Sequence, residues 1–181
     1  GALQVRTGYR SYAGTAEDIC KQIIENCWDE NHFNVSAGYQ VFFRLREFSL
    51  CTGPLIRLGY KDKVMKTLEY CLQRYAKHGT VRKAIFEDVP LDGFGRKCDT
   101  LPFLIHSLRK SKNYVLVDTY KDFLAAEARR YHDTFLNKHT GLAKRVAKGK
   151  PTTLYDNIML GMLARNLALL KIHNPLREYD Y

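Results

Sequence analysis

The chain has 181 residues and a formal net charge of +10 at pH 7, with 45% hydrophobic and 27% charged residues. This balance is typical of one globular domain with a sizeable core, and no stretch approaches the roughly 18 consecutive apolar residues of a membrane-spanning helix. We therefore expect no membrane partner. The positive charge favours an acidic partner, such as nucleic acid, an anionic glycan or an acidic protein surface.

The cysteines are odd in number and widely scattered, with no CxxC pair and no histidine at zinc-ligand spacing. They are Cys20, Cys27, Cys51, Cys71 and Cys98. This pattern favours small buried thiols in a reducing compartment, such as the cytoplasm, over a disulfide framework. We expect no bound metal and no cofactor. The opening GALQVRTGYR has no initiator methionine, which leaves open a processed terminus or an excised piece.

The first two predicted helices differ in character. Gly14–Trp28 is amphipathic. Its apolar stripe consists of Ile19, Cys20, Ile23, Ile24 and Cys27. Val41–Leu58 is apolar nearly all round, which predicts burial on most of its sides.

The same alternation continues along the chain. Lys61–His78 is amphipathic and stops at Gly79, the residue type that most often ends a helix. A loop follows, with room for one short strand within Thr80–Phe86, and Asp99–Leu108 is then a short apolar helix. Each amphipathic helix is thus followed by an apolar one.

The last pair of helices completes the pattern. Tyr114–Phe135 is amphipathic, and Leu154–Leu170 is apolar almost throughout. Helices with one wet side should lie outside helices with none. We therefore predict a single all-α domain over residues 1–181, built from three stacked antiparallel helical hairpins in two layers.

The predicted hairpins also resemble one another in sequence. KHGTVRKAI at 77–85 and KHTGLAKRV at 138–146 each follow an amphipathic helix. Both helices carry an Arg-Tyr pair near their ends, Arg74-Tyr75 and Arg130-Tyr131. An internal period of about 50 residues is the signature of repeated helical hairpins.

Three motifs resemble the first half of the six-hairpin glycosidases, the (α/α)6 toroids that include glucoamylase-like and trehalase-like enzymes. They are FFRLREFSLCTGPLIRLGYKDKVMKTLEYCLQRYAKHGTV at 42–81, GRKCDTLPFLIHSL at 95–108, and HTGLAKRV followed by LYDNIMLGMLARNLALL. Together they span about residues 40–172. The resemblance implies a partial toroid that binds or hydrolyses an oligo- or polysaccharide, with water as co-substrate and no metal.

Two departures from that family leave catalysis unassigned. Three hairpins are half of a closed ring, and Gly141–Tyr155 contains no Asp or Glu where several such families place the general acid. Glu47 also stands where the family usually has Asp. Glu87 and Asp88, on the loop after the second amphipathic helix, are the remaining catalytic candidates, and a solvated loop is the alternative for both.

Candidate substrate-binding residues lie where the apolar helices begin. Glu47, Asp99 and Asp156 each open such a helix, where they would either hold sugar hydroxyls or cap the helix. Arg46 would hold hydroxyls or form an interhelical ion pair, and aromatic rings would stack on sugars. The full predicted set is Tyr39, Arg46, Glu47, Phe94, Arg96, Asp99, Tyr155 and Asp156.

Two other functions remain open at this point. A basic helical module would bind nucleic acid or another polyanion, and its affinity would fall steeply with salt. Its contacts would be Arg82, Lys83, Lys144, Arg145, Lys148 and Lys150. A structural half-ring would instead cover its exposed apolar edges by assembling with a partner chain or with itself as a homo-oligomer.

Overall fold

The structure is a computed structural model that describes residues 10–38, 41–93, 97–144 and 152–179. The helices are α1 (Arg10–Asn26), α2 (Leu45–Arg57), α3 (Lys61–His78), α4 (Thr100–Ser111), α5 (Tyr114–Thr119), α6 (Lys121–Phe135) and α7 (Leu154–Leu169). The strands are β1 (Trp28–Asp29), β2 (His32–Phe33), β3 (Phe43–Arg44), β4 (Ala84–Phe86) and β5 (Val89–Leu91).

The prediction of an all-α fold is wrong, because two small antiparallel sheets accompany the helices. One sheet pairs β1 with β2, and the other has the order β3-β4-β5. In the second sheet Phe43 lies opposite Ile85, and both side chains are buried. The chain before α2 therefore pairs with the α3–α4 loop, so α2 begins four residues later than the apolar run suggested.

The turn between β4 and β5 explains why this sheet is hard to see in the sequence. Its two residues, Glu87 and Asp88, have φ angles of 45° and 65°. A two-residue hairpin turn with both central residues at positive φ usually carries Asn-Gly or Asp-Gly. Glu-Asp gives no such signal, and β4 and β5 have only three residues each.

Most predicted helices are present, with changes at their ends. The bounds of α3 are those expected, and Gly79 ends it at φ 92°. The segment predicted as one helix over Tyr114–Phe135 is divided at Tyr120 into α5 and α6. The expected strand within Thr80–Phe86 is β4.

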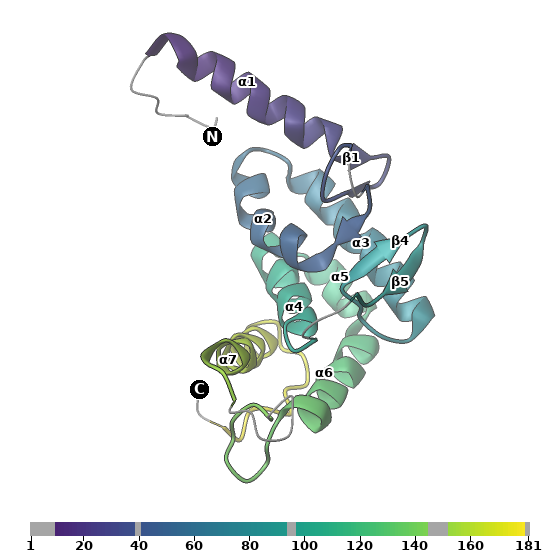
Figure 1. Cartoon of the computed structure of the whole chain (residues 1–181). Helices are drawn as coiled ribbons and strands as arrows, with labels where there is room; N and C mark the ends of the chain where they lie inside the picture. Colours follow the sequence, from purple (N-terminus) through teal and green to yellow (C-terminus); the bar gives the residue numbers. More distant parts are fainter. Residues whose placement is uncertain (1–9, 39–40, 94–96, 145–151, 180–181) are drawn as a thin grey trace.

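The core is organised around α4. This helix packs against α2 on one side and α7 on the other, and Leu104, Ile105 and Leu108 have no exposed surface. Figure 1 shows α2, α4 and α7 in one row, with α3, α5 and α6 forming the other layer.

Small polar residues bring α2 and α4 close together. Ser49 donates a hydrogen bond of 2.9 Å to the carbonyl of Phe103, and the Oγ1 of Thr52 lies 3.5 Å from the Oγ of Ser107. Gly53 faces Lys110, and a Cβ at this glycine would lie 3.2 Å from the Cε of that lysine. The row thus depends on small side chains as well as on leucine packing.

The apolar stripe predicted for the first helix is largely exposed. Ile23 has 58% of its surface exposed, and Cys20 is exposed as well. In Figure 1 α1 extends away from the other helices, and its contacts are concentrated at its last turn, where Glu25 pairs with Lys63. The expectation of buried cysteines is wrong for Cys20 and for Cys51 on α2, which is also exposed.

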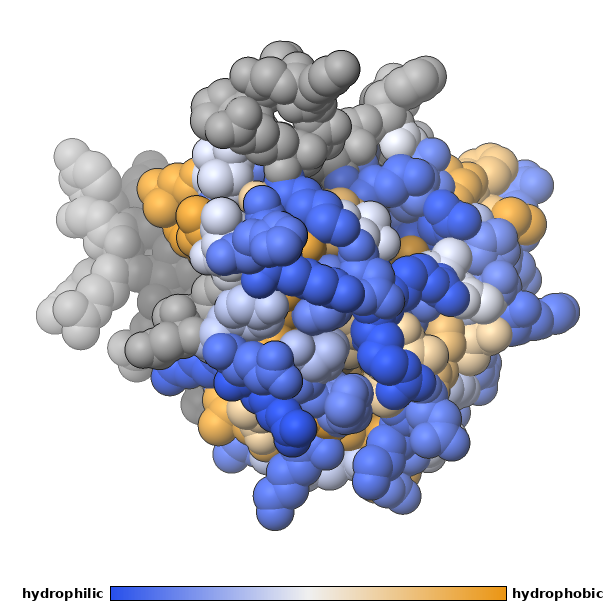
Figure 2. All heavy atoms as spheres, turned by 90° about the horizontal axis from the view of Figure 1, so that it is seen from below, coloured by the Kyte–Doolittle hydropathy of each residue, from blue (hydrophilic) through white to orange (hydrophobic). Residues whose placement is uncertain are grey.

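The surface is mainly hydrophilic on the face shown in Figure 2, where apolar side chains form separate patches between charged ones. Within the described ranges, no helix combines the length and the apolar character that crossing a membrane would require. Exposed large apolar side chains lie on α1, α2, the β4–β5 hairpin, α5 and α7.

Replacing Leu104 by alanine tests the central position of α4. The side chain is completely buried between two helices, so we expect the free energy of unfolding to fall by about 2–5 kcal/mol. Leu154→Ala is the matched control, because Leu154 is 79% exposed and its loss should change stability by less than about 0.5 kcal/mol. Urea titrations followed by circular dichroism measure both, and equal losses would contradict the packing described.

Candidate functional site

Side chains from the starts of α2, α4 and α7 meet at one end of the row. The Nη1 of Arg46 lies 3.8 Å from the Oδ2 of Asp99, and its Nη2 lies 3.5 Å from the Oε1 of Glu47. The hydroxyl of Tyr155 donates a hydrogen bond of 2.6 Å to the same Oδ2. We call these four residues the rim, because they join three helix starts in one polar cluster.

The rim is held from two further directions. Arg44 lies just before α2, and its Nε lies 3.4 Å from the Oε2 of Glu47. The amide of Leu45 donates a hydrogen bond of 2.9 Å to the carbonyl of Lys83, which fixes the start of α2 against the α3–α4 loop. The second sheet therefore positions Arg46 and Glu47 relative to Asp99.

Asp99 and Asp156 were both expected to bind sugar or to cap a helix, but the structure gives them different roles. Asp156 is 3% exposed and forms a capping box with Thr153 at the start of α7. Asp99 precedes α4 but makes no side-chain cap. Its carboxylate is instead occupied by groups from α2 and α7, so Asp99 belongs to the rim and Asp156 to the helix end.

The electrostatics of the rim favour a charged arginine and a protonated tyrosine. Burial lowers the pKa of Arg46, but the negative charges of Glu47 and Asp99 outweigh this effect and raise it overall. Burial and the hydrogen bond to Asp99 both raise the pKa of Tyr155 well above its ordinary value. At neutral pH the rim therefore presents a guanidinium and a phenol beside the side chains of Glu47 and Asp99.

A hollow of about 170 Å³ is lined by Lys97 and Thr100, which flank Asp99 of the rim closely in the chain. Its walls come from the α3–α4 loop, the first turn of α4 and the second half of α6. The charged side chains that line it are Arg82, Asp92, Lys97, Glu127 and Arg130. Tyr131 connects the hollow to the rim, since its hydroxyl donates to the carbonyl of Cys98 at 2.5 Å.

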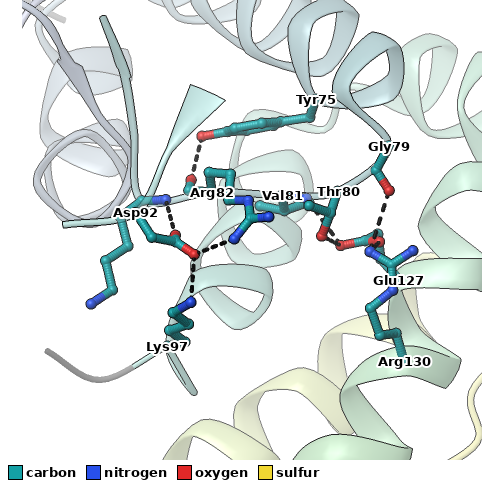
Figure 3. A network of polar contacts seen from close by, with 10 residues as sticks. Tyr75, Gly79, Thr80, Val81, Arg82, Asp92, Lys97, Glu127 and Arg130 are labelled. Carbon is teal, nitrogen blue, oxygen red and sulfur yellow. Dashed lines mark hydrogen bonds and ion pairs between the residues drawn. The ribbon is translucent and has the colours of Figure 1, made fainter. Parts of the chain in front are cut away.

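Asp92 is the centre of one half of the hollow. Its Oδ2 lies 2.6 Å from the Nη1 of Arg82 and 3.1 Å from the Nζ of Lys97, and its Oδ1 accepts from the amide of Lys83 at 3.1 Å. Figure 3 shows these groups around the carboxylate. Asp92 thereby orders the loop that forms one wall.

Glu127 is the centre of the other half, although it comes from α6. Its Oε2 accepts from the hydroxyl of Thr80 at 2.9 Å and from the amide of Val81 at 3.0 Å. Its Oε1 lies 2.6 Å from the Nη1 of Arg130, which also donates to the carbonyl of Gly79 at 3.2 Å (Figure 3). The end of α3 is thus tied to α6.

The catalytic candidates lie elsewhere. Glu87 and Asp88 form the exposed tip of the β4–β5 hairpin, and Asp88 pairs with Arg74 at 2.5 Å. Within the described ranges, no hydrogen bond or ion pair joins either residue to the rim. The resemblance placed them near the mouth of the ring, but the hairpin directs them toward α3.

The remaining candidates divide between described and undescribed parts of the chain. Arg82 pairs with Asp92, Lys83 follows it in the same loop, and the ammonium of Lys144 donates to the carbonyl of Asp133 at 2.5 Å. The other predicted residues lie outside the described ranges. They are Tyr39, Phe94, Arg96, Arg145, Lys148 and Lys150.

Sequence reasoning missed Lys97, Glu127 and Arg130 as members of a site. The repeated Arg-Tyr pairs carried part of the signal, since Arg130 belongs to one of them. The tyrosine of each pair donates to a loop carbonyl: Tyr75 to Arg82 at 2.7 Å, as Tyr131 does to Cys98. Glu127 gave no signal, because its burial depends on a loop 46 residues earlier in the chain.

Comparison with known protein families, curated proteins and solved structures gives no match to this chain. In the described residues, no group of three or more His, Cys, Asp or Glu side chains is arranged to hold a metal ion. The function must therefore be argued from the rim and the hollow themselves.

The pH dependence of stability tests the role of Asp92. Burial would raise its pKa, but the hydrogen bonds from Arg82, Lys97 and the Lys83 amide outweigh it and lower the pKa below its ordinary 3.8. A lowered pKa stabilises the fold above the unfolded-state value, and this stabilisation is lost as pH falls through the folded-state value. We expect Asp92→Asn to lower the free energy of unfolding by about 1–3 kcal/mol at pH 7.

The difference between Asp92→Asn and the unsubstituted protein should shrink as the pH is lowered through and below 3.8, where Asp92 itself becomes neutral. Asp118→Asn on the exposed side of α5 is the control. Denaturant titrations at several pH values measure the effect. An unchanged stability at pH 7 would show that Asp92 does not order the loop.

Proposed function

We propose that the rim binds carbohydrate. The observation that carries the proposal is the position of Asp99, whose carboxylate links Arg46 of α2 to Tyr155 of α7 instead of capping its own helix. Such a cluster places donors, acceptors and an aromatic ring within one small area at the surface. Sugars require this combination, because their hydroxyl groups both donate and accept hydrogen bonds and their ring faces are apolar.

The rim residues are accessible to different degrees. The side chain of Arg46 is 53% exposed and that of Glu47 is 34% exposed, whereas that of Asp99 is 9% exposed. A sugar would therefore meet Arg46, Glu47 and the partly exposed Tyr155 directly. Asp99 would act beneath them by holding the guanidinium and the phenol in place, which limits the entropy lost on binding.

The proposal covers binding and leaves hydrolysis aside. Glycoside hydrolysis needs a protonated carboxyl group and an ionised one on opposite sides of the scissile bond. At the rim, Glu47 lies between Arg44 and Arg46, and Asp99 accepts from Tyr155. Both carboxyl groups are thus already engaged by neighbouring side chains, and nothing in their contacts marks one of them as the acid.

The motif resemblance to six-hairpin glycosidases supports the same substrate class. We also place the protein in a reducing compartment, because the described cysteines are all in the thiol form and two of them are exposed.

Arg46→Met tests the proposal. The substitution keeps the length of the side chain but removes the charge and every donor, so we expect oligosaccharide affinity to fall at least about tenfold. Arg57→Met is the matched control, because Arg57 is exposed at the opposite end of the same helix. Calorimetric titration with a panel of neutral and acidic oligosaccharides measures the affinities.

The same preparations should be titrated with single-stranded RNA and duplex DNA at two salt concentrations. Nucleic-acid binding would weaken steeply with salt. Strong salt-sensitive RNA binding without any response to oligosaccharides would reject the carbohydrate proposal in favour of a polyanion-binding module. Equal affinities of Arg46→Met and Arg57→Met for sugars would show that the rim is not the binding site.

A second candidate function is self-assembly of the chain, which is favoured by apolar side chains exposed at the two ends of the helix row. At one end α2 exposes Leu50, which is 65% accessible, and at the other α7 exposes Ile158, which is 51% accessible. Each end presents an apolar helix face, so a second copy of the chain could cover both. Exposed apolar faces of this kind commonly mark protein interfaces.

Light scattering tests the assembly. We expect the unsubstituted protein to have at least twice the mass of a monomer, and Leu50→Glu and Ile158→Glu to shift it toward the monomer. Val115→Glu is the control, because Val115 is 76% exposed on α5, away from both ends. A monodisperse monomer that binds no hydrophobic dye would contradict this candidate.

A further inference from the structure

Three of the four carboxylate oxygens in the hollow accept hydrogen bonds, and the fourth, the Oε1 of Glu127, is held only by an ion pair with Arg130 in the described part of the chain. Both oxygens of Asp92 accept hydrogen bonds, and Oδ2 is shared by Arg82 and Lys97. The Oε2 of Glu127 accepts two more, and its Oε1 faces Arg130. These groups therefore offer little to a ligand that needs acceptors.

Lys97 and Arg130 have more N–H donors than their contacts with the described residues use. Lys97 has three N–H groups and contacts Asp92 with its Nζ, and Arg130 has five N–H groups and uses only its Nη1 in the contacts seen here. Their side chains are 55% and 54% exposed. With Arg82, three cations face two carboxylates, so a net positive charge remains.

The first turn of α4, which forms the floor of the hollow, also favours a negatively charged ligand. Thr100 and Leu101 belong to the first turn of α4, so the positive end of that helix dipole faces the space. In the described part of the chain, the buried hydroxyl of Thr100 has no hydrogen-bond partner. The volume of about 170 Å³ would hold about five or six waters, or one small polar group.

We propose that the hollow binds the oxyanion of an acidic sugar residue, a carboxylate or a sulfate, and so makes the rim selective for anionic glycans. This inference rests on the proposed carbohydrate binding at the rim. Lys97 and Arg130 provide the charge-assisted hydrogen bonds, and Thr100 lies at the end of α4 beneath them. Arg130 suits either group, because its planar fork matches paired oxygens.

The rim and the hollow are close enough to act on one oligosaccharide. Asp99 of the rim lies between Lys97 and Thr100 of the hollow in the chain, and Tyr131 lines the hollow while donating to Cys98. Neutral sugar units would contact Arg46 and Glu47, and an acidic unit would extend past this segment. The rim then supplies sugar recognition, and the hollow supplies charge selectivity.

Paired ligands test the proposal with the full chain. The probes are an oligouronate, the same oligosaccharide with its carboxyl groups reduced to alcohols, a sulfated oligosaccharide, and inorganic sulfate and phosphate. We expect the oligouronate to bind at least about tenfold more tightly than its reduced counterpart. Calorimetric titration at two salt concentrations gives the affinities.

Lys97→Met is the main variant, because Asp92 keeps Arg82 and the Lys83 amide when the ammonium is removed. It should lower oligouronate affinity about tenfold and leave the reduced oligosaccharide unchanged. Arg130→Gln is the second variant, since the amide can still donate to Glu127. Lys121→Met, exposed at the start of α6, is the control, and melting temperatures verify that each variant folds.

The outcomes separate the two proposals. Equal binding of the acidic and reduced oligosaccharides, both weakened by Arg46→Met, would overturn the hollow's role and leave carbohydrate binding intact. Binding of inorganic sulfate or phosphate that depends on Lys97, without binding of any oligosaccharide, would show a simple anion site and overturn both. Binding of neither sugars nor anions would also overturn both.

Discussion

The position of α4 between α2 and α7 is the constraint on which the rest of the structure depends. Leu104, Ile105 and Leu108 of this helix are completely buried, and Ser49 and Thr52 allow α2 to approach it closely. Because these contacts fix the order of the row, they also fix where its helices begin. A rim made from residues far apart in the chain follows from that packing.

The second sheet and the α3–α4 loop hold the residues of the candidate site in place at the helix starts. The pairing of β3 with β4 holds the start of α2 against the α3–α4 loop, and Asp92 and Glu127 hold the same loop from opposite sides. The buried carboxylate of Glu127 and the partly buried one of Asp92 therefore organise backbone that would otherwise lack partners. The cations that satisfy these carboxylates are the ones that face the hollow.

The sequence predicts those parts of the molecule that depend on local pattern. The bounds of α3 follow from its apolar spacing and from Gly79, and Arg46, Glu47 and Asp99 were expected near one another because each lies at a helix start. Tertiary contacts decided the rest. The choice for Asp99 between capping and linking helices depends on Tyr155, 56 residues away, and the burial of Glu127 depends on a loop from another hairpin.

The weak attachment of α1 predicts that this helix unfolds locally before the rest of the described fold. In the last turn of this helix Ile24 packs against the core and Glu25 pairs with Lys63, and Cys27 packs just beyond it, while Ile19 and Ile23 are at least half exposed. Its backbone amides should therefore exchange with deuterium long before those of α4, through local fraying that leaves the inner row undisturbed. The helix α1 and the remainder of the described fold thus differ in cooperativity.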